Sequence, residues 1–118
     1  MVYVMVDLGI IITKPPVETN LVNRFLQIAK GTIENNKTVG LFLISDGVWL
    51  VKKNQNNNSF ELLKNLIEKN VEIIVSKDHL LSAGLSENEI IENIKISEKP
   101  YSDLVDNVME NYEKVIKI

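Results

Sequence analysis

The sequence predicts an α/β domain of three layers, α/β/α, built on a mostly parallel five-stranded sheet. Short apolar runs of strand length alternate along the chain with segments whose apolar residues recur at helical spacing. Parallel neighbouring strands need long crossover connections, and helices supply them. The 118 residues suit one domain, so a single domain over residues 1–118 is expected.

The first strand is predicted over residues 2–8, a run rich in β-branched residues without polar alternation, as in a strand covered on both faces. Residues 9–16 end in two prolines, which cannot continue a strand ladder, and are predicted to form an extended loop. Thr19 or Asn20 is then a candidate N-cap for a helix whose apolar positions extend to Ile33.

The middle of the chain repeats this alternation. A second strand is predicted over residues 38–44, and residues 45–47 (SDG) after it are typical of a tight turn. The polar residues 54–58 indicate a surface loop. Ser59 is a candidate N-cap for a helix that extends to Lys69 and carries one apolar stripe.

A third strand is predicted over residues 71–75. Asp78 is placed to cap a short helix after it, which Gly84 can end in a left-handed conformation. Residues 86–89 (SENE) then have the spacing of a capping box, which indicates the start of another helix.

The last third is predicted to hold a short extended piece at residues 94–96, a helix of about ten residues after Pro100, and a final strand at residues 114–118. Four apolar side chains of that helix are expected to face inward: Leu104, Val105, Val108 and Met109.

Composition excludes several classes of function. A net charge of −3 argues against a nucleic-acid surface, which needs clustered Lys and Arg to displace counterions from phosphates. The absence of cysteine removes disulfides, thiolate metal sites and thiol nucleophiles. The apolar residues 2–12 contain Asp7 and follow no basic region, so they are typical of a strand rather than a signal peptide. No segment approaches the roughly 20 apolar residues of a membrane span. We expect a cytoplasmic protein that binds neither nucleic acid nor membrane.

Ligands of open parallel sheets gather beyond the carboxyl ends of strands, where loops and helix N-termini present free donors. Three clusters follow predicted strands: residues 7–13, 45–47 and 76–79. The last two predict a pocket for a small molecule or an anion. Its candidate ligand-binding residues are Ser45, Asp46, Gly47, Ser76, Lys77, Asp78 and His79.

Each candidate also has a structural explanation. His79 is the single histidine and could act as a general acid or base with Asp46 or Asp78, because its reference pKa of about 6.5 lies near neutrality. A half-exposed ring in the first turn of a helix is equally ordinary. Asp46 before a glycine suits a turn, and Asp78 suits an N-cap. Lys77 could attract an anion or simply be solvated.

Neither a metal nor a cofactor is expected. One histidine and scattered carboxylates show no ligand spacing for a metal, and no glycine-rich phosphate loop is present. Trp49 is either a core residue or an anchor at an interface with a partner, since aromatic residues are enriched where proteins meet.

Four segments carry a resemblance to a known family: residues 41–48 (LFLISDGV), 71–76 (VEIIVS), 83–85 (AGL) and 109–116 (MENYEKVI). In their order and spacing they resemble the DsrE/DsrF-like family, over essentially the whole chain. The resemblance implies a flavodoxin-like arrangement of strands and a homo-oligomer, or a hetero-oligomer with related subunits. For the best-known members it also implies sulfur carried as a persulfide on a cysteine after the third strand.

The chain departs from that pattern where it matters chemically. The matching segment is residues 76–79 (SKDH), so Ser76 or a near neighbour holds the cysteine position, and a hydroxyl cannot form a persulfide. The resemblance therefore favours an accessory or binding subunit without cysteine-based sulfur transfer, and a non-catalytic role over an enzyme. Two alternatives stay open: a module that binds a small ligand or anion at the strand ends, and an acid/base enzyme that uses His79.

Overall fold

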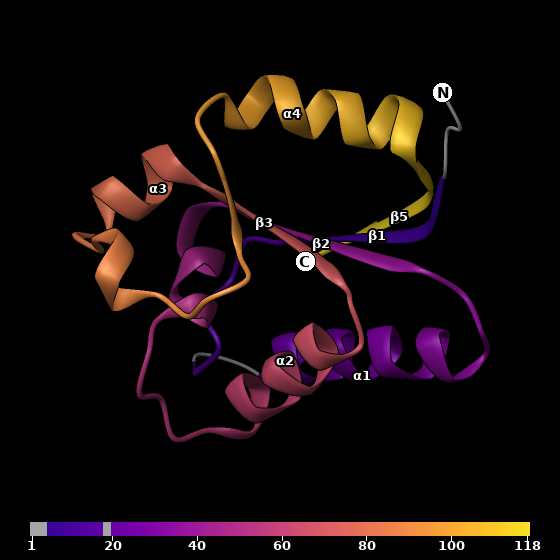
Figure 1. Cartoon of the computed structure of the whole chain (residues 1–118), viewed down its shortest axis with the longest axis horizontal. Coiled ribbons are helices and arrows are strands. Elements are labelled where there is room, and N and C mark those ends of the chain that lie inside the picture. The colour runs from indigo at the N-terminus through magenta and orange to yellow at the C-terminus, as the bar shows by residue number, and fades with distance from the viewer. Residues whose placement is uncertain (1–4, 18–19) are drawn as a thin grey trace.

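Five parallel strands form one sheet in the part of the chain that the computed structural model describes, residues 5–17 and 20–118 (Figure 1). The strands are β1 (Val6–Ile12), β2 (Val39–Leu43), β3 (Glu72–Ser76), β4 (Lys95–Ser97) and β5 (Tyr112–Lys117). Their order across the sheet is β4-β3-β2-β1-β5, and every neighbouring pair runs parallel. The predicted five-stranded sheet is confirmed, and it is parallel throughout.

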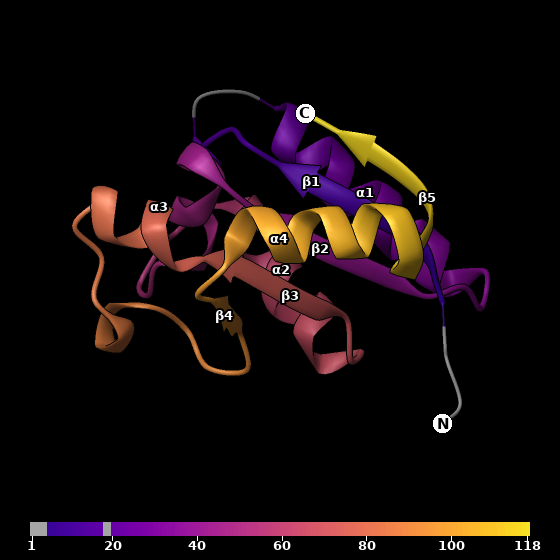
Figure 2. The ribbon, with the colours of Figure 1, turned by 90° about the horizontal axis from the view of Figure 1, so that it is seen from above.

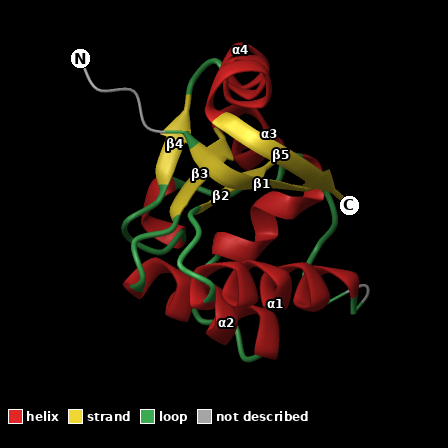
Figure 3. Cartoon of the chain, turned by 90° about the vertical axis from the view of Figure 1, so that its right-hand side faces the viewer, coloured by secondary structure: helices red, strands yellow, loops and turns green. Residues whose placement is uncertain are grey.

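Helices cover both faces of the sheet, which confirms the three layers (Figure 3). The helices are α1 (Leu21–Glu34), α2 (Asn58–Glu68), α3 (Lys77–Ser82) and α4 (Pro100–Asp106), with 3₁₀ helices η1 (Ser45–Val51) and η2 (Glu87–Glu89) and the π-helical segment η3 (Asn107–Asn111). The first two pack side by side on one face, and α4 covers the other. No helix in the described part of the chain is long and apolar enough to span a bilayer.

The first strand begins and ends later than predicted. β1 spans Val6–Ile12, while residues 1–4 lie outside the described residues. Ile10 and Ile12 belong to the core on the side of α1 and α2, whereas Ile11 belongs to the core beneath α4. A strand buried on both faces shows no polar alternation. The three isoleucines that the prediction placed in a loop, residues 10–12, are therefore a buried part of β1.

The two cores differ greatly in size. The core beneath α1 and α2 contains buried side chains from every strand but the two edge strands, together with side chains of η1. The core beneath α4 consists of Ile11, Phe42 and Ile74, against which partly buried residues pack: Ile44, Leu104 and Val108.

The ring of Tyr112 packs on the sheet against two glycines, Gly9 of β1 and Gly40 of β2. A Cβ on Gly9 would lie 2.0 Å from the Tyr112 ring, so this position needs glycine to admit the ring. A Cβ on Gly40 would lie 3.0 Å from the ring, which is a tight contact. The phenol oxygen is buried and has no hydrogen-bond partner among the described residues. Burial raises the pKa of Tyr112 well above its usual range, and the nearby Glu72 carboxylate adds to the effect.

Two helix caps lie two residues before the predicted ones. Asn57, not Ser59, caps α2: its Oδ1 accepts a hydrogen bond of 2.8 Å from the backbone N–H of Phe60. Ser76, not Asp78, caps α3, because it is the last extended residue of the strand before the helix and its hydroxyl accepts from the His79 N–H at 3.3 Å. An N-cap lies just outside the helix, whereas Ser59 and Asp78 lie within the first turn.

The remaining signals of the sequence are partly confirmed. Asn20 precedes α1 but makes no side-chain cap bond, and Thr19 lies outside the described residues. Gly84 has the expected left-handed backbone, with φ of 76°. The capping box of Ser86 and Glu89 forms, but it begins the single 3₁₀ turn η2 rather than a longer helix.

Four side chains of the last helix were expected to face inward, and the prediction is wrong for two of them. Leu104 and Val108 pack on the sheet, but Val105 is 59% exposed and Met109 is 76% exposed. Consecutive helical residues are about 100° apart around the axis, so a helix that rests on a sheet by one side cannot bury both members of each pair. An apolar stripe therefore remains on the outer surface of α4.

Candidate functional site

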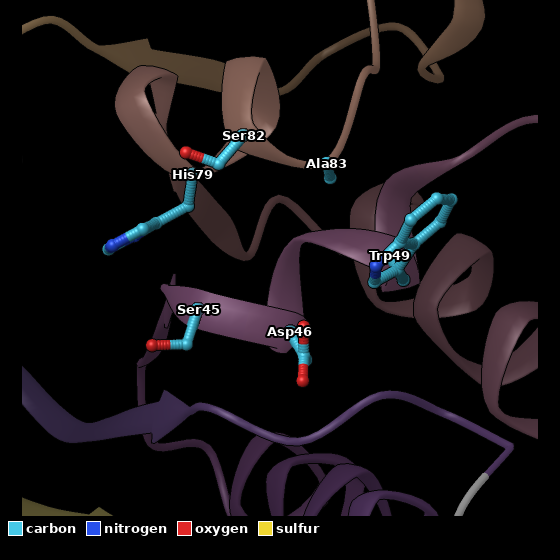
Figure 4. Close-up of a pocket in the computed structure, with 6 residues that line it drawn as sticks. All are labelled: Ser45, Asp46, Trp49, His79, Ser82 and Ala83. Carbon is cyan, nitrogen blue, oxygen red and sulfur yellow. The ribbon is translucent and has the colours of Figure 1, made fainter.

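A hollow of about 420 Å³ lies beyond the carboxyl ends of β2 and β3 (Figure 4). The helix η1, which follows β2, contributes Ser45, Asp46 and Trp49, and the segment of α3, which follows β3, contributes the rest: His79, Ser82 and Ala83. The hollow lies where ligands of open parallel sheets usually bind, beyond the carboxyl ends of strands, and we call it the strand-end pocket.

A close approach of two backbones fixes η1 in place. The Ile44 N–H donates to the Ile12 carbonyl at 3.1 Å, and the Gly47 N–H donates to the Ile44 carbonyl at 2.9 Å. A Cβ on Gly47 would lie 2.1 Å from the same Ile12 oxygen, which no real Cβ tolerates. The predicted tight turn is instead a 3₁₀ helix, and Gly47 serves packing and does not line the pocket. Ser45 takes the left-handed backbone, with φ of 52°.

Trp49 lies between the larger core and the strand-end pocket, and its role as an anchor for a partner stays a prediction. Its side chain is partly buried against the larger core, and it lines the strand-end pocket. The Gln55 amide closes the end of η1 behind it by donating to the carbonyls of Trp49 at 2.8 Å and of Lys52 at 2.8 Å. The ring of Trp49 is therefore held on a fixed backbone.

His79 has an aromatic neighbour rather than a carboxylate. Its Nε2 lies 3.3 Å from the Tyr101 hydroxyl, and the two rings meet edge to face with centroids 6.0 Å apart. Its Nδ1 is buried and makes no hydrogen bond within the described residues. Neither Asp46 nor Asp78 therefore holds the ring as the partner that the acid/base hypothesis requires.

Three predicted residues lie away from the strand-end pocket. The Ser76 side chain is fully buried beneath the first turn of α3. The Lys77 ammonium pairs with the Glu98 carboxylate at 3.1 Å on the surface, where such a pair contributes little to stability. Asp78 is exposed. Of the seven candidates, the fold brings only Ser45, Asp46 and His79 together.

Sequence reasoning did not propose Ser82, Ala83 or Tyr101. Ser82 and Ala83 follow His79 by three and four positions, which places them on its side of the short helix predicted there, so that prediction could have found them. Tyr101 is 22 residues from His79 in the chain, and no local pattern brings the two together.

Most of the cluster of residues 7–13 lies within β1 and not beyond its carboxyl end. Asp7 lies at the opposite end of the sheet, where its Oδ2 accepts from the Thr38 N–H at 2.8 Å and from the Thr38 hydroxyl at 3.0 Å. These hydrogen bonds, the backbone one first, lower the pKa of Asp7. Asp7 therefore joins the starts of β1 and β2.

No three metal-ligating side chains within residues 5–17 and 20–118 come together as a candidate metal site. The pocket offers one carboxylate, one imidazole, two hydroxyls and an indole. Such a set can orient a small polar molecule by hydrogen bonds and pack an apolar portion of it against the indole.

Comparison with known proteins identifies the fold and the family. The chain has a TM-score of 0.81 to the ychN protein of E. coli at 22% identity, which covers 97% of this chain and 100% of the other. A protein of unknown function, MTH1491 from Methanobacterium thermoautotrophicum, gives a TM-score of 0.76 at 12% identity, over 96% and 99% of the two chains. These structures show the same fold.

Two archaeal proteins are similar in sequence. Uncharacterized protein MK0008 of Methanopyrus kandleri is 32% identical over 86% of each chain. Uncharacterized protein MJ0989 of Methanocaldococcus jannaschii is 33% identical over 75% of this chain and 81% of its own. The model of the DsrE/DsrF-like family matches residues 7–117, and the chain therefore belongs to the DsrE/DsrF-like family.

Proposed function

We propose that this protein is an oligomeric DsrE-like subunit with an accessory or binding role and without cysteine-based sulfur transfer. The observation that carries the proposal is the state of Ser76. Ser76 is the last residue of β3, and its side chain is fully buried. The resemblance implies that Ser76 or a near neighbour holds the position of the sulfur-carrying cysteine. With no cysteine anywhere in the sequence, no thiolate is available to accept sulfur.

The surroundings of Ser76 support a structural role for its hydroxyl. The hydroxyl accepts a hydrogen bond from the backbone N–H of His79, which is the ordinary duty of an N-cap. An attacking serine needs a base that removes its proton. The His79 group that contacts Ser76 is a backbone donor, while the ring reaches Tyr101.

The binding role is supported by the strand-end pocket. Asp46 brings a negative charge to it, and the one cation predicted for an anion, Lys77, pairs with Glu98 elsewhere. A neutral or cationic polar ligand therefore suits the pocket better than an anion does. This favours ligand binding as a second candidate function over the acid/base reaction, for which His79 lacks a carboxylate partner among the described residues.

Assembly with further subunits, of this chain or of related ones, is supported by exposed apolar side chains. Leu81 on α3 is 65% exposed, and Tyr101 on α4 is 62% exposed. Large exposed apolar side chains mark surfaces that partners cover when they form a patch. The cytoplasmic location expected from the sequence stays a prediction.

The test is native mass spectrometry of the protein purified gently from its own cells, before and after treatment with a low-molecular-weight persulfide. We expect more than one subunit per particle and no gain of a sulfur atom per chain. The variant Asp78→Cys, treated identically, is the control, because Asp78 is exposed in the same segment and a thiol there should accept sulfur. Stable sulfur on the wild-type chain would refute the proposal, and a strictly monomeric wild type would refute its oligomeric part.

A further inference from the structure

Three large apolar side chains form a line along the outer side of α4 and η3. Tyr101, Val105 and Met109 are 62%, 59% and 76% exposed. They are four residues apart, which places neighbours one above the other on a helix surface. We call these three residues the α4 stripe. Figure 2 shows the helix lying across the outside of the sheet, with nothing from the described chain above it.

No described part of the chain buries this stripe. The inner side of the helix is already occupied, since Leu104 and Val108 pack on the sheet. α1 and α2, which contact each other, lie on the opposite face. Residues 5–17 and 20–118 therefore leave the α4 stripe uncovered, and a second molecule can cover it.

The edges of the sheet are poor alternatives for association. β4 is only three residues long, and the exposed residues of β5 include Glu113, Lys114 and Lys117. Short edge strands and edge charges, lysine above all, are features that prevent strand pairing between chains. The helical face is thus a better apolar surface for assembly than either edge of the sheet.

We propose that the α4 stripe is covered by the α4 stripe of a second copy of this chain, with the two helices antiparallel around a twofold axis at Val105. This inference rests on the proposed oligomeric function and names its interface. A twofold interface needs a surface that is complementary to itself. The stripe meets this need, because Tyr101 and Met109 are equidistant from Val105 along the chain. Each tyrosine ring then faces a methionine sulfur, a favourable contact.

Charge favours the antiparallel direction. Lys99 precedes the helix and Glu110 lies near its end, and both are exposed. An antiparallel pair brings the lysine of one copy toward the glutamate of the other. It also places the positive end of each helix dipole beside the negative end of its partner's. A parallel pair would place like charges side by side.

The interface would also reach the strand-end pocket. Tyr101 belongs to the α4 stripe, and its hydroxyl lies 3.3 Å from His79 Nε2. A partner that covers Tyr101 removes its freedom to leave the imidazole. Assembly therefore holds Tyr101 against His79, which lines the pocket.

The absence of cysteine permits a direct test by disulfide trapping, because an introduced cysteine is the only thiol. Val105→Cys lies on the axis and should form a disulfide dimer on mild oxidation. Tyr101→Cys and Met109→Cys should not dimerise singly but should cross-link when mixed. Lys30→Cys, exposed on α1, is the control and should stay monomeric on denaturing gels. Self-linking of Tyr101→Cys without mixed products would overturn the antiparallel arrangement.

Sedimentation equilibrium separates this inference from the proposed function. Val105→Asp should raise the dissociation constant at least about 100-fold, because it buries an unpaired carboxylate from each copy. Val17→Asp is the matched control at another exposed valine, 78% exposed, and should change nothing. A wild type that is monomeric overturns the α4 interface and the oligomeric part of the proposed function. Wild-type assembly that survives Val105→Asp, with no Val105→Cys disulfide, overturns the α4 interface alone.

Discussion

The same substitution, glycine to alanine, should have opposite effects at two positions of this chain. At Gly47 the new Cβ would lie 2.1 Å from the Ile12 carbonyl oxygen, whereas ordinary contact begins at 3.4 Å. The obstacle is backbone, so η1 and β1 must separate by about 1.3 Å. At Gly31, in the interior of α1, a Cβ meets nothing within 4 Å.

Separation of η1 from β1 lengthens the hydrogen bond from the Ile44 N–H to the Ile12 carbonyl, now 3.1 Å. Loss of one such bond and the strain of an overfilled contact together should lower the free energy of unfolding by about 2–4 kcal/mol in Gly47→Ala. Gly31→Ala should raise it by about 0.5–1 kcal/mol, because alanine loses less conformational freedom than glycine in a helix.

Urea unfolding followed by circular dichroism measures both changes. The single tryptophan, Trp49, lies two residues after Gly47, so its emission maximum reports whether η1 has moved. It should shift in Gly47→Ala and not in Gly31→Ala. A Gly47→Ala protein within about 0.5 kcal/mol of wild type, with unchanged emission, would refute the close approach as the reason for this glycine.

Asp7 should make the protein lose stability in acid. Its folded pKa is lowered below 3.8, the ordinary value of an aspartate, so its contribution to stability is full above that pH and is lost as pH falls through the folded pKa. Asp7→Asn should therefore make stability depend less on pH in acid. Tyr112 has a raised pKa, so stability should fall once pH exceeds about 10, and Tyr112→Phe should remove that decline without loss at neutral pH. Asn57→Ala should cost about 1 kcal/mol in thermal or urea unfolding, and Asn56→Ala, its neighbour, should cost nothing comparable. Equal effects of the last two would contradict Asn57 as the cap.

The order of elements could be predicted because each signal is local. Helical spacing marks α1 and α2, and apolar runs between polar segments mark β2 and β3. The start of the sheet could not be located in this way. A run such as residues 9–12, buried on both faces, has no period that distinguishes it from an apolar loop.

The last helix shows a second limit of periodicity. Leu104 and Val108 recur at helical spacing, and so do Val105 and Met109. The pattern alone cannot tell which pair faces the sheet and which faces solvent. An interface on the outer side produces the same spacing as a core on the inner side.

The pocket was predictable only in its location. Strand ends indicated the right edge of the sheet, but the side chains there depend on contacts across the chain. Lys77 turns to Glu98, 21 residues away, and His79 turns to Tyr101. Both partners come from the segment around β4 and α4, whose position is set by strand order, and strand order is not encoded in any short motif.

The unequal cores determine how variants on α4 can be interpreted. The larger core joins β1, β2 and β3 to α1 and α2, and it contains most of the buried apolar side chains, whereas the core beneath α4 holds three fully buried ones. Loss of packing on the α4 side should therefore cost little of the total stability. Val105 and Met109 lie outside even this small core. A charged residue at Val105 should leave the monomer folded, so any loss of assembly in that variant reports the interface and not the fold.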